Sequence, residues 1–122
     1  MKERAKFSWK KRLRSFNFAF NGIKLLLKYE HNAWLHLGAL FGVVIACILF
    51  NVSAIEWCVI LLCIGMVFSA EAVNSSIEAL ADRITVEKDP LIGKAKDLSA
   101  AAVLILAIIS IGVACFIFIP KF

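Results

Sequence analysis

The sequence predicts an all-α integral membrane protein, with an amphipathic interfacial helix followed by three transmembrane helices. Three observations predict this fold class. Hydrophobic residues make up 61% of the 122 residues, with a mean hydropathy of +0.85, against roughly 45–50% apolar residues in soluble domains. Three apolar runs are long enough to cross a bilayer, and a basic amphipathic segment precedes them. A chain of this length forms a single domain, 1–122, whose apolar surface is covered mostly by lipid tails.

Residues 1–29 form the predicted amphipathic surface helix. Apolar side chains fall on one stripe of this helix and polar or basic side chains on another: Trp9, Leu13, Phe16, Phe20, Ile23 and Leu27 against Lys10, Arg14, Asn17, Asn21, Lys24 and Lys28. Two roles fit this pattern, namely a basic anchor for anionic headgroups and a lid over an interfacial active site. Because about thirty such residues precede the first apolar run, we do not expect a cleaved signal peptide.

The three predicted transmembrane helices are 33–50, 57–80 and 98–119. At about 1.5 Å per residue, helices of this length match a hydrocarbon core of about 30 Å. His36 interrupts the first run, and we expect it to be a satisfied histidine inside the bundle rather than a ligand. The cysteines are interpreted as small buried hydrophobic residues, since all four lie in apolar runs: Cys47, Cys58, Cys63 and Cys115.

The basic residues predict which side of the membrane each segment occupies. Residues 1–28 hold nine of the fourteen Lys and Arg, whereas the connection 51–56 has none. The positive-inside bias therefore places the N-terminus in the cytoplasm. The second connection, 83–96, is also predicted to be a cytoplasmic loop because it is basic: it contains Arg83, Lys88, Lys94 and Lys96.

A polar stripe closes the second predicted span. Its members are spaced i, i+3, i+7 and i+11, so they lie within an arc of about 80° on a helix: Glu71, Asn74, Glu78 and Asp82. Because carboxylates in lipid cost up to a few kcal/mol each, the stripe should face other helices or a wet cavity. At the same membrane face we expect Glu30 from the first span, and Lys94, Lys96 and Asp97 from the start of the third.

This group of charges suits phosphoryl transfer. Carboxylates hold Mg²⁺, lysine offsets phosphate charge, and one carboxylate can accept a proton from an attacking hydroxyl. No P-loop or glycine-rich kinase motif occurs, so those nucleotide-binding folds are excluded. Two other interpretations remain open on spacing alone: polar residues that only pair with one another or with headgroups, and a proton or ion path.

The segment 71–82 contains E-x-x-N-S-S-I-E-x-x-x-D, and 95–104 contains A-K-D-x-x-x-x-A-V-L. Both segments, their separation and the three-span layout closely resemble the small prokaryotic diacylglycerol kinases and undecaprenol kinases. The resemblance implies a multi-pass homotrimer in the bacterial inner membrane, with a cytoplasmic N-terminus. It implies transfer of the γ-phosphoryl group of ATP, with Mg²⁺ as cofactor, to the hydroxyl of a membrane lipid. It implies no nucleic-acid partner.

The resemblance also implies roles for individual residues. Glu71 matches the catalytic base and Asn74 the polar residue beside it, while Glu30 and Glu78 match the metal-binding carboxylates. Nucleotide contacts are implied for Lys96, Asp97, Asp82, Phe18, Glu87 and Asp89. Lipid contacts are implied for Lys11, Arg12, Glu71 and Ala100. Phe18 replaces a tyrosine of some members, and Lys11 or Arg12 replaces an arginine.

The spacing of Glu71 and Glu78 separates their tasks. Seven residues of helix span about 10 Å, so one carboxylate cannot serve both the metal and the acceptor hydroxyl. A single three-helix chain offers little surface to enclose ATP, which fits sites shared between subunits. Diacylglycerol is the first expected acceptor and undecaprenol the alternative, because the sequence has features of both branches. The interpretation from another class is a non-enzymatic scaffold or proton-conducting bundle.

Overall fold

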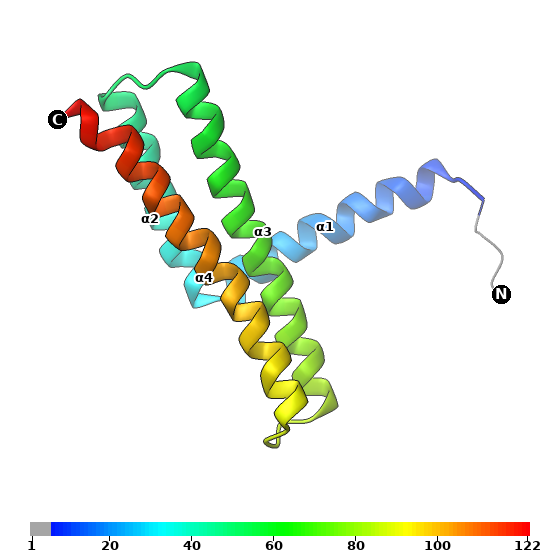
Figure 1. The fold of residues 1–122 in the computed structure, drawn as a ribbon. Coiled ribbons are helices and arrows are strands. Elements are labelled where there is room, and N and C mark those ends of the chain that lie inside the picture. The colour runs from blue at the N-terminus through cyan, green and yellow to red at the C-terminus, as the bar shows by residue number, and fades with distance from the viewer. Residues whose placement is uncertain (1–5) are drawn as a thin grey trace.

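The computed structural model describes residues 6–122, and over that range it consists of helices (Figure 1). Three of them are long and apolar enough to cross a membrane, namely α2, α3 and α4. The all-α fold with a preceding N-terminal helix and three candidate spans is confirmed. The elements are α1 (Trp9–Tyr29), α2 (His31–Leu49), α3 (Ala54–Ile84), α4 (Pro90–Phe118) and a short 3₁₀ helix, η1 (Ile119–Lys121). Residues 1–5 of the predicted surface helix lie outside the described range.

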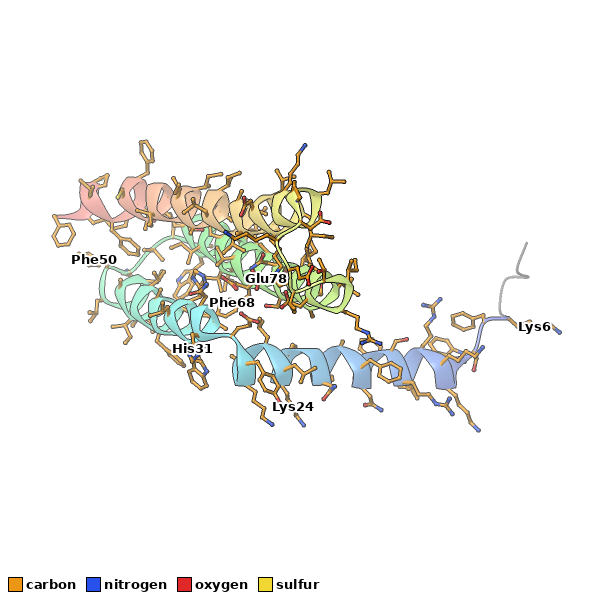
Figure 2. All side chains as sticks on the ribbon, turned by 90° about the horizontal axis from the view of Figure 1, so that it is seen from below. Lys6, Lys24, His31, Phe50, Phe68 and Glu78 are labelled. Atoms are coloured by element: carbon orange, nitrogen blue, oxygen red, sulfur yellow. The ribbon has the colours of Figure 1, made fainter. Side chains whose placement is uncertain are left out.

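α1 meets the bundle at a sharp elbow and projects away from α2, α3 and α4 (Figure 1). The elbow is Glu30, whose extended backbone (φ −102°, ψ 111°) ends α1 and precedes α2. Across it, Trp34 Nε1 donates a hydrogen bond of 2.6 Å to the carbonyl oxygen of Leu27. Lys24 lies on the side of α1 that faces away from the bundle (Figure 2). This geometry suits a helix that lies along a surface while the others cross it.

The connection between α3 and α4 is shorter than the loop predicted at 83–96. Only residues 85–89 separate the two helices. Asp89 caps α4, since its Oδ1 accepts hydrogen bonds from the backbone N–H groups of Leu91 and Ile92 at 3.0 and 3.1 Å. Pro90 follows at the first helical position, where its missing N–H costs nothing. As a result, Lys96 lies on a helix and not in a loop.

The opposite end of the bundle is closed by side chains from three segments. Asn51 turns the chain between α2 and α3 with a positive φ of 50°, which asparagine tolerates better than most residues. Ser53 and Glu56 form a capping box at the start of α3. Lys121 then donates to the Glu56 carboxylate from the end of the chain, at 3.1 and 3.2 Å. We call this group the outer clamp: Ser53, Glu56 and Lys121.

The apolar core adjoins the outer clamp. It consists of Cys47, Val52, Ile60 and Ile117. Elsewhere, large apolar side chains are exposed along every helix, which suits contact with lipid or with other copies of the chain. The interpretation of all four cysteines as buried was wrong, because Cys58 and Cys115 are exposed. An apolar run does not distinguish a core-facing position from a lipid-facing one.

Candidate active site

Glu71 is the most deeply buried carboxylate among the described residues. It lies within α3 with 1% of its surface exposed. Its Oε1 lies 3.2 Å from Nε2 of His36 on α2. Its Oε2 is also buried, and over residues 6–122 it has no hydrogen-bond partner. Because an unsatisfied buried polar atom is costly, a carboxylate with one paired and one unpaired oxygen indicates a group kept ready for a ligand.

One turn further along α3, Asn74 is held by α4. Ser99 Oγ donates to Asn74 Oδ1 at 2.6 Å, and Ser99 itself is 7% exposed. With Oδ1 occupied, the Asn74 side-chain NH₂ group remains able to donate to a ligand. α3 and α4 therefore fix the orientation of this amide.

Toward the connection, the polar stripe becomes more exposed. Glu78 is half-buried on α3 (Figure 2). Asp82 is exposed and accepts a hydrogen bond from Lys96 Nζ of α4. The stripe predicted from helical spacing thus meets α4 at two levels, through Asn74 and through Asp82. Glu71, at its deeper end, is instead bonded to α2.

Three residues expected to contact the nucleotide line one hollow. Lys96 lies there with Glu87 and Asp89, in a hollow of about 420 Å³ built on the α3–α4 connection. Asp97, the next residue of α4, is exposed. The Asp89 carboxylate is already engaged in capping α4. The hollow is lined by two cations, Lys88 and Lys96, beside the acidic residues Glu87 and Asp89. The two lysines are the groups in it that suit an anion.

The single chain does not gather every expected site residue. Glu30 lies at the α1–α2 elbow. Lys11, Arg12 and Phe18 are exposed on α1, which runs away from the bundle, and the Arg12 guanidinium lies over the ring of Phe7 at 5.3 Å. Ala100 is exposed on α4, next to Ser99.

The carboxylates do not form a preassembled metal cage. Within residues 6–122, no group of three or more His, Cys, Asp or Glu side chains is close enough to hold a metal ion. Mg²⁺ in phosphoryl-transfer sites is commonly held by one or two carboxylates, with phosphate oxygens and water filling the other positions. The half-buried carboxylates of Glu30 and Glu78 fit that chemistry without forming a complete cage.

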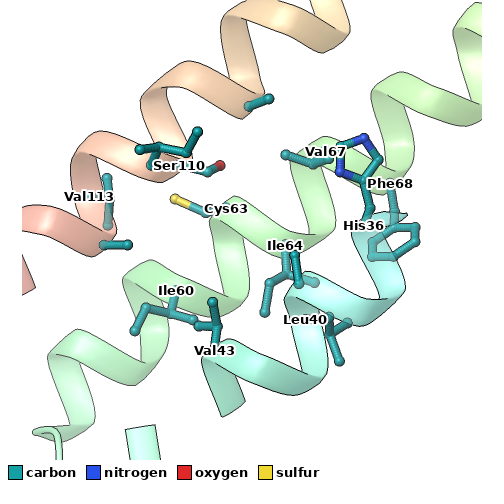
Figure 3. A pocket seen from close by; sticks show the side chains of 14 residues that line it. His36, Leu40, Val43, Ile60, Cys63, Ile64, Val67, Phe68, Ser110 and Val113 are labelled. Atoms are coloured by element: carbon teal, nitrogen blue, oxygen red, sulfur yellow. The ribbon is translucent and has the colours of Figure 1, made fainter. Parts of the chain in front are cut away.

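An apolar cavity of about 260 Å³ lies between α2, α3 and α4. His36 and Phe68 stand at one end of it, and Ile60 and Val43 toward the other (Figure 3). His36 therefore has the cavity on one side and the Glu71 carboxylate within hydrogen-bond distance. The T-shaped contact between the His36 and Phe68 rings, with centroids 6.3 Å apart, helps to fix the imidazole.

Two contacts of the site were missed from the sequence. We expected His36 to be satisfied inside the bundle, and it is, but its partner is the candidate base itself. Ser99 was not singled out, although it holds Asn74. Both contacts join different helices, at separations of 35 and 25 residues. Helical periodicity relates residues of one helix only and carries no signal for such pairs.

Comparison with known proteins identifies the family to which the chain belongs. The chain is 41% identical over 108 residues to the undecaprenol kinase of Bacillus subtilis (strain 168), which covers 88% of each chain. It is 44% identical over 72 residues to the diacylglycerol kinase of Escherichia coli (strain K12), or 59% of this chain and 58% of that one. The family model for prokaryotic diacylglycerol kinase matches residues 17–118. This range includes both the polar stripe and the start of α4, and the chain belongs to the prokaryotic diacylglycerol kinase family.

Proposed function

We propose that this protein is an ATP-dependent lipid kinase, in which Glu71 activates the hydroxyl of a membrane lipid alcohol. The observation that carries the proposal is the state of the Glu71 carboxylate, which is buried, bonded through Oε1 and unpartnered at Oε2 among the described residues. A scaffold gains nothing from such an atom, whereas a general base requires one. Membership of a lipid-kinase family supports the same function.

In the proposed reaction, Glu71 Oε2 accepts the proton of the lipid hydroxyl as its oxygen attacks the γ-phosphorus. The new O–P bond forms while the bond from that phosphorus to the β–γ bridging oxygen breaks, and ADP leaves with its electron pair. Lys96 lies nearer the connection, in the hollow beside Glu87 and Asp89, and offsets phosphate charge there. The Asn74 amide donates to an oxygen of the reacting groups and keeps them oriented.

We propose Glu78 and Glu30 as the carboxylates that hold Mg²⁺ with ATP. The ion, when bound, neutralises charge on the phosphate oxygens. We expect Glu78→Gln and Glu30→Gln each to raise the Mg²⁺ concentration at half-maximal rate by about tenfold or more, as measured by titration at fixed total ATP. Unchanged titrations for both variants would remove these two residues from the metal site.

Two acceptors enter the proposal. Diacylglycerol is supported by the family and by the 44% identity to a diacylglycerol kinase. Undecaprenol is the second candidate, favoured by the similarity to an undecaprenol kinase that extends over 88% of both chains. Both are alcohols with long apolar tails, and an apolar groove distinguishes tails only weakly.

The decisive assay follows the labelled γ-phosphate of ATP, with Mg²⁺, into diacylglycerol and undecaprenol offered in parallel to the purified protein in mixed micelles. We expect label in one of the lipids, and we expect Glu71→Gln to lose it while keeping the elution volume of the wild type. Label in neither lipid, from protein of intact oligomeric size, would contradict the kinase and favour the non-enzymatic bundle.

We also propose a homotrimer with active sites shared between copies. In one chain, Lys11, Arg12 and Phe18 lie on α1, which projects away from the bundle (Figure 1). The exposed apolar helix faces offer surface for neighbours. Light scattering in detergent should give the mass of three chains. Mixing Glu71→Gln with a Lys11→Ala/Arg12→Ala double variant should restore activity above either alone. A single-chain mass with no restoration would contradict shared sites.

We propose that the protein lies in the bacterial inner membrane with its N-terminus in the cytoplasm. The bias of Lys and Arg toward 1–28 and the α3–α4 connection supports this orientation. Trypsin added to inverted membrane vesicles should cleave these basic segments, and trypsin added to spheroplasts should spare them. The reverse pattern would overturn the orientation.

A further inference from the structure

We propose that His36 is a positioning residue for the phosphoryl-transfer step, which holds the Glu71 carboxylate so that Oε2 faces the acceptor hydroxyl. This inference rests on the proposed lipid-kinase function. The two residues lie 35 positions apart, on α2 and α3, with Nε2 and Oε1 3.2 Å apart. His36 is half-buried, with 24% of its side chain exposed, and Glu71 is almost fully buried.

The donor and acceptor of this contact follow from chemistry. An ionised carboxylate only accepts hydrogen bonds, so the His36 Nε2 atom carries the proton and donates it to Oε1. The carboxyl group is planar, so fixing Oε1 also fixes the direction of Oε2. A Glu side chain has several rotatable bonds, and without this bond the carboxylate would sample orientations in which Oε2 misses the hydroxyl.

The surroundings show that the contact is built to hold one geometry. Phe68 precedes Glu71 by three residues on α3, so both lie on the same face of that helix, and its ring meets the His36 ring edge-on at 6.3 Å between centroids. His36 thus packs against Phe68 on one side (Figure 3) and is hydrogen-bonded to Glu71 on another. Throughout 6–122, the buried Oε2 atom has no second partner that would pull the carboxylate elsewhere.

A structural polar pair would look different. In such a pair both carboxylate oxygens are satisfied, as they are in Glu56, which accepts from Ser53 N and Lys121 through Oε1 and from Lys121 through Oε2. At Glu71, only one oxygen has a partner among residues 6–122. Burying the other without a partner opposes folding, which indicates that the pair serves orientation at some expense to stability.

The test compares His36→Gln with His36→Met in the full-length protein. The two replacement side chains have nearly the same length, but Gln retains an N–H donor and Met has none. For each variant, kcat and the KM values for the lipid and for ATP with Mg²⁺ are measured in mixed micelles. His31→Met is the matched control, since His31 is the other histidine of the chain and is exposed at the start of α2.

We expect His36→Met to lower kcat by about 10- to 100-fold, the effect of one hydrogen bond to a charged group, with the KM for ATP unchanged. His36→Gln should recover at least about fivefold of that loss, and His31→Met should match the wild type. Equal kcat values for the Gln and Met variants, at equal oligomeric size, would overturn the positioning role. A wild type that labels no lipid would instead remove the proposed function itself, and this inference with it.

Discussion

Two glutamates of α3, Glu56 and Glu71, differ in both burial and hydrogen bonding. Glu56, in the outer clamp, is a quarter exposed and accepts hydrogen bonds on both oxygens, from Ser53 and Lys121. Glu71 is 1% exposed and has one oxygen bonded to His36. The more buried carboxylate is therefore the less satisfied one, which is the reverse of what stability alone favours.

The difference separates a structural carboxylate from a reactive one on the same helix. A group whose hydrogen-bonding capacity is filled by its own chain has nothing left for a substrate. A buried, oriented carboxylate with only one hydrogen-bonded oxygen keeps its other oxygen free to accept a proton from a ligand. Burial or charge alone does not distinguish the two glutamates. The number of carboxylate oxygens that have a hydrogen-bond partner does.

The strongest test of this comparison replaces each glutamate with glutamine. Glu71→Gln should lower kcat by about 10²- to 10⁴-fold, because an amide cannot act as the general base. Glu56→Gln should leave kcat within about twofold, since a Gln amide oxygen can still accept the backbone bond of the capping box. Steady-state label transfer measures both. Similar losses in the two variants would mean that the contrast in satisfied atoms has no catalytic meaning.

A smaller effect is expected at the second level of the polar stripe. Ser99→Ala removes the donor that holds Asn74 and should lower kcat by about 3- to 10-fold, as expected for a lost neutral hydrogen bond. The matched control is Ser110→Ala, also on α4, whose hydroxyl donates to the carbonyl oxygen of Leu106 in its own helix. If both serine variants have the same kcat, Ser99 does not orient Asn74 for the reaction.

The smallest effect belongs to the outer clamp. Lys121→Met removes the cation that bonds to Glu56, and isolated exposed ion pairs contribute little. We expect the thermal midpoint to fall by a few degrees at most and kcat at low temperature to stay at the wild-type value. Scanning calorimetry and label transfer on one preparation check both. A clear loss of kcat would show that the two ends of α3 are coupled.

The sequence alone predicts the features that recur with the period of a single helix. The number of helices and the polar stripe from Glu71 to Asp82 follow from apolar run length and helical spacing. The loop predicted at 83–96 is longer than the observed connection, 85–89. Its bounds were set by basic residues, and basic residues do not indicate where a helix begins or ends. Asp89 followed by Pro90 was the helix-start signal that applied there.

The side-chain contacts between different helices could not be predicted from the sequence. The His36–Glu71 and Ser99–Asn74 contacts depend on how α2 and α4 are rotated about their axes, and lipid-facing and core-facing residues are equally apolar in such a chain. The same ambiguity led to the wrong interpretation of Cys58 and Cys115. For residues on α1, including Lys11 and Phe18, the site they serve remains a prediction, since one chain alone does not bring them to Glu71.

The outer clamp also sets an order of events during synthesis. Its ion pair joins residues 65 positions apart. The three contacts of the candidate site join residues that are only 35, 25 and 14 positions apart, and all of these residues precede residue 100. The ribosome therefore delivers both partners of each of these three contacts before it delivers Lys121. Closure of the clamp therefore marks a chain in which α4 has been completed.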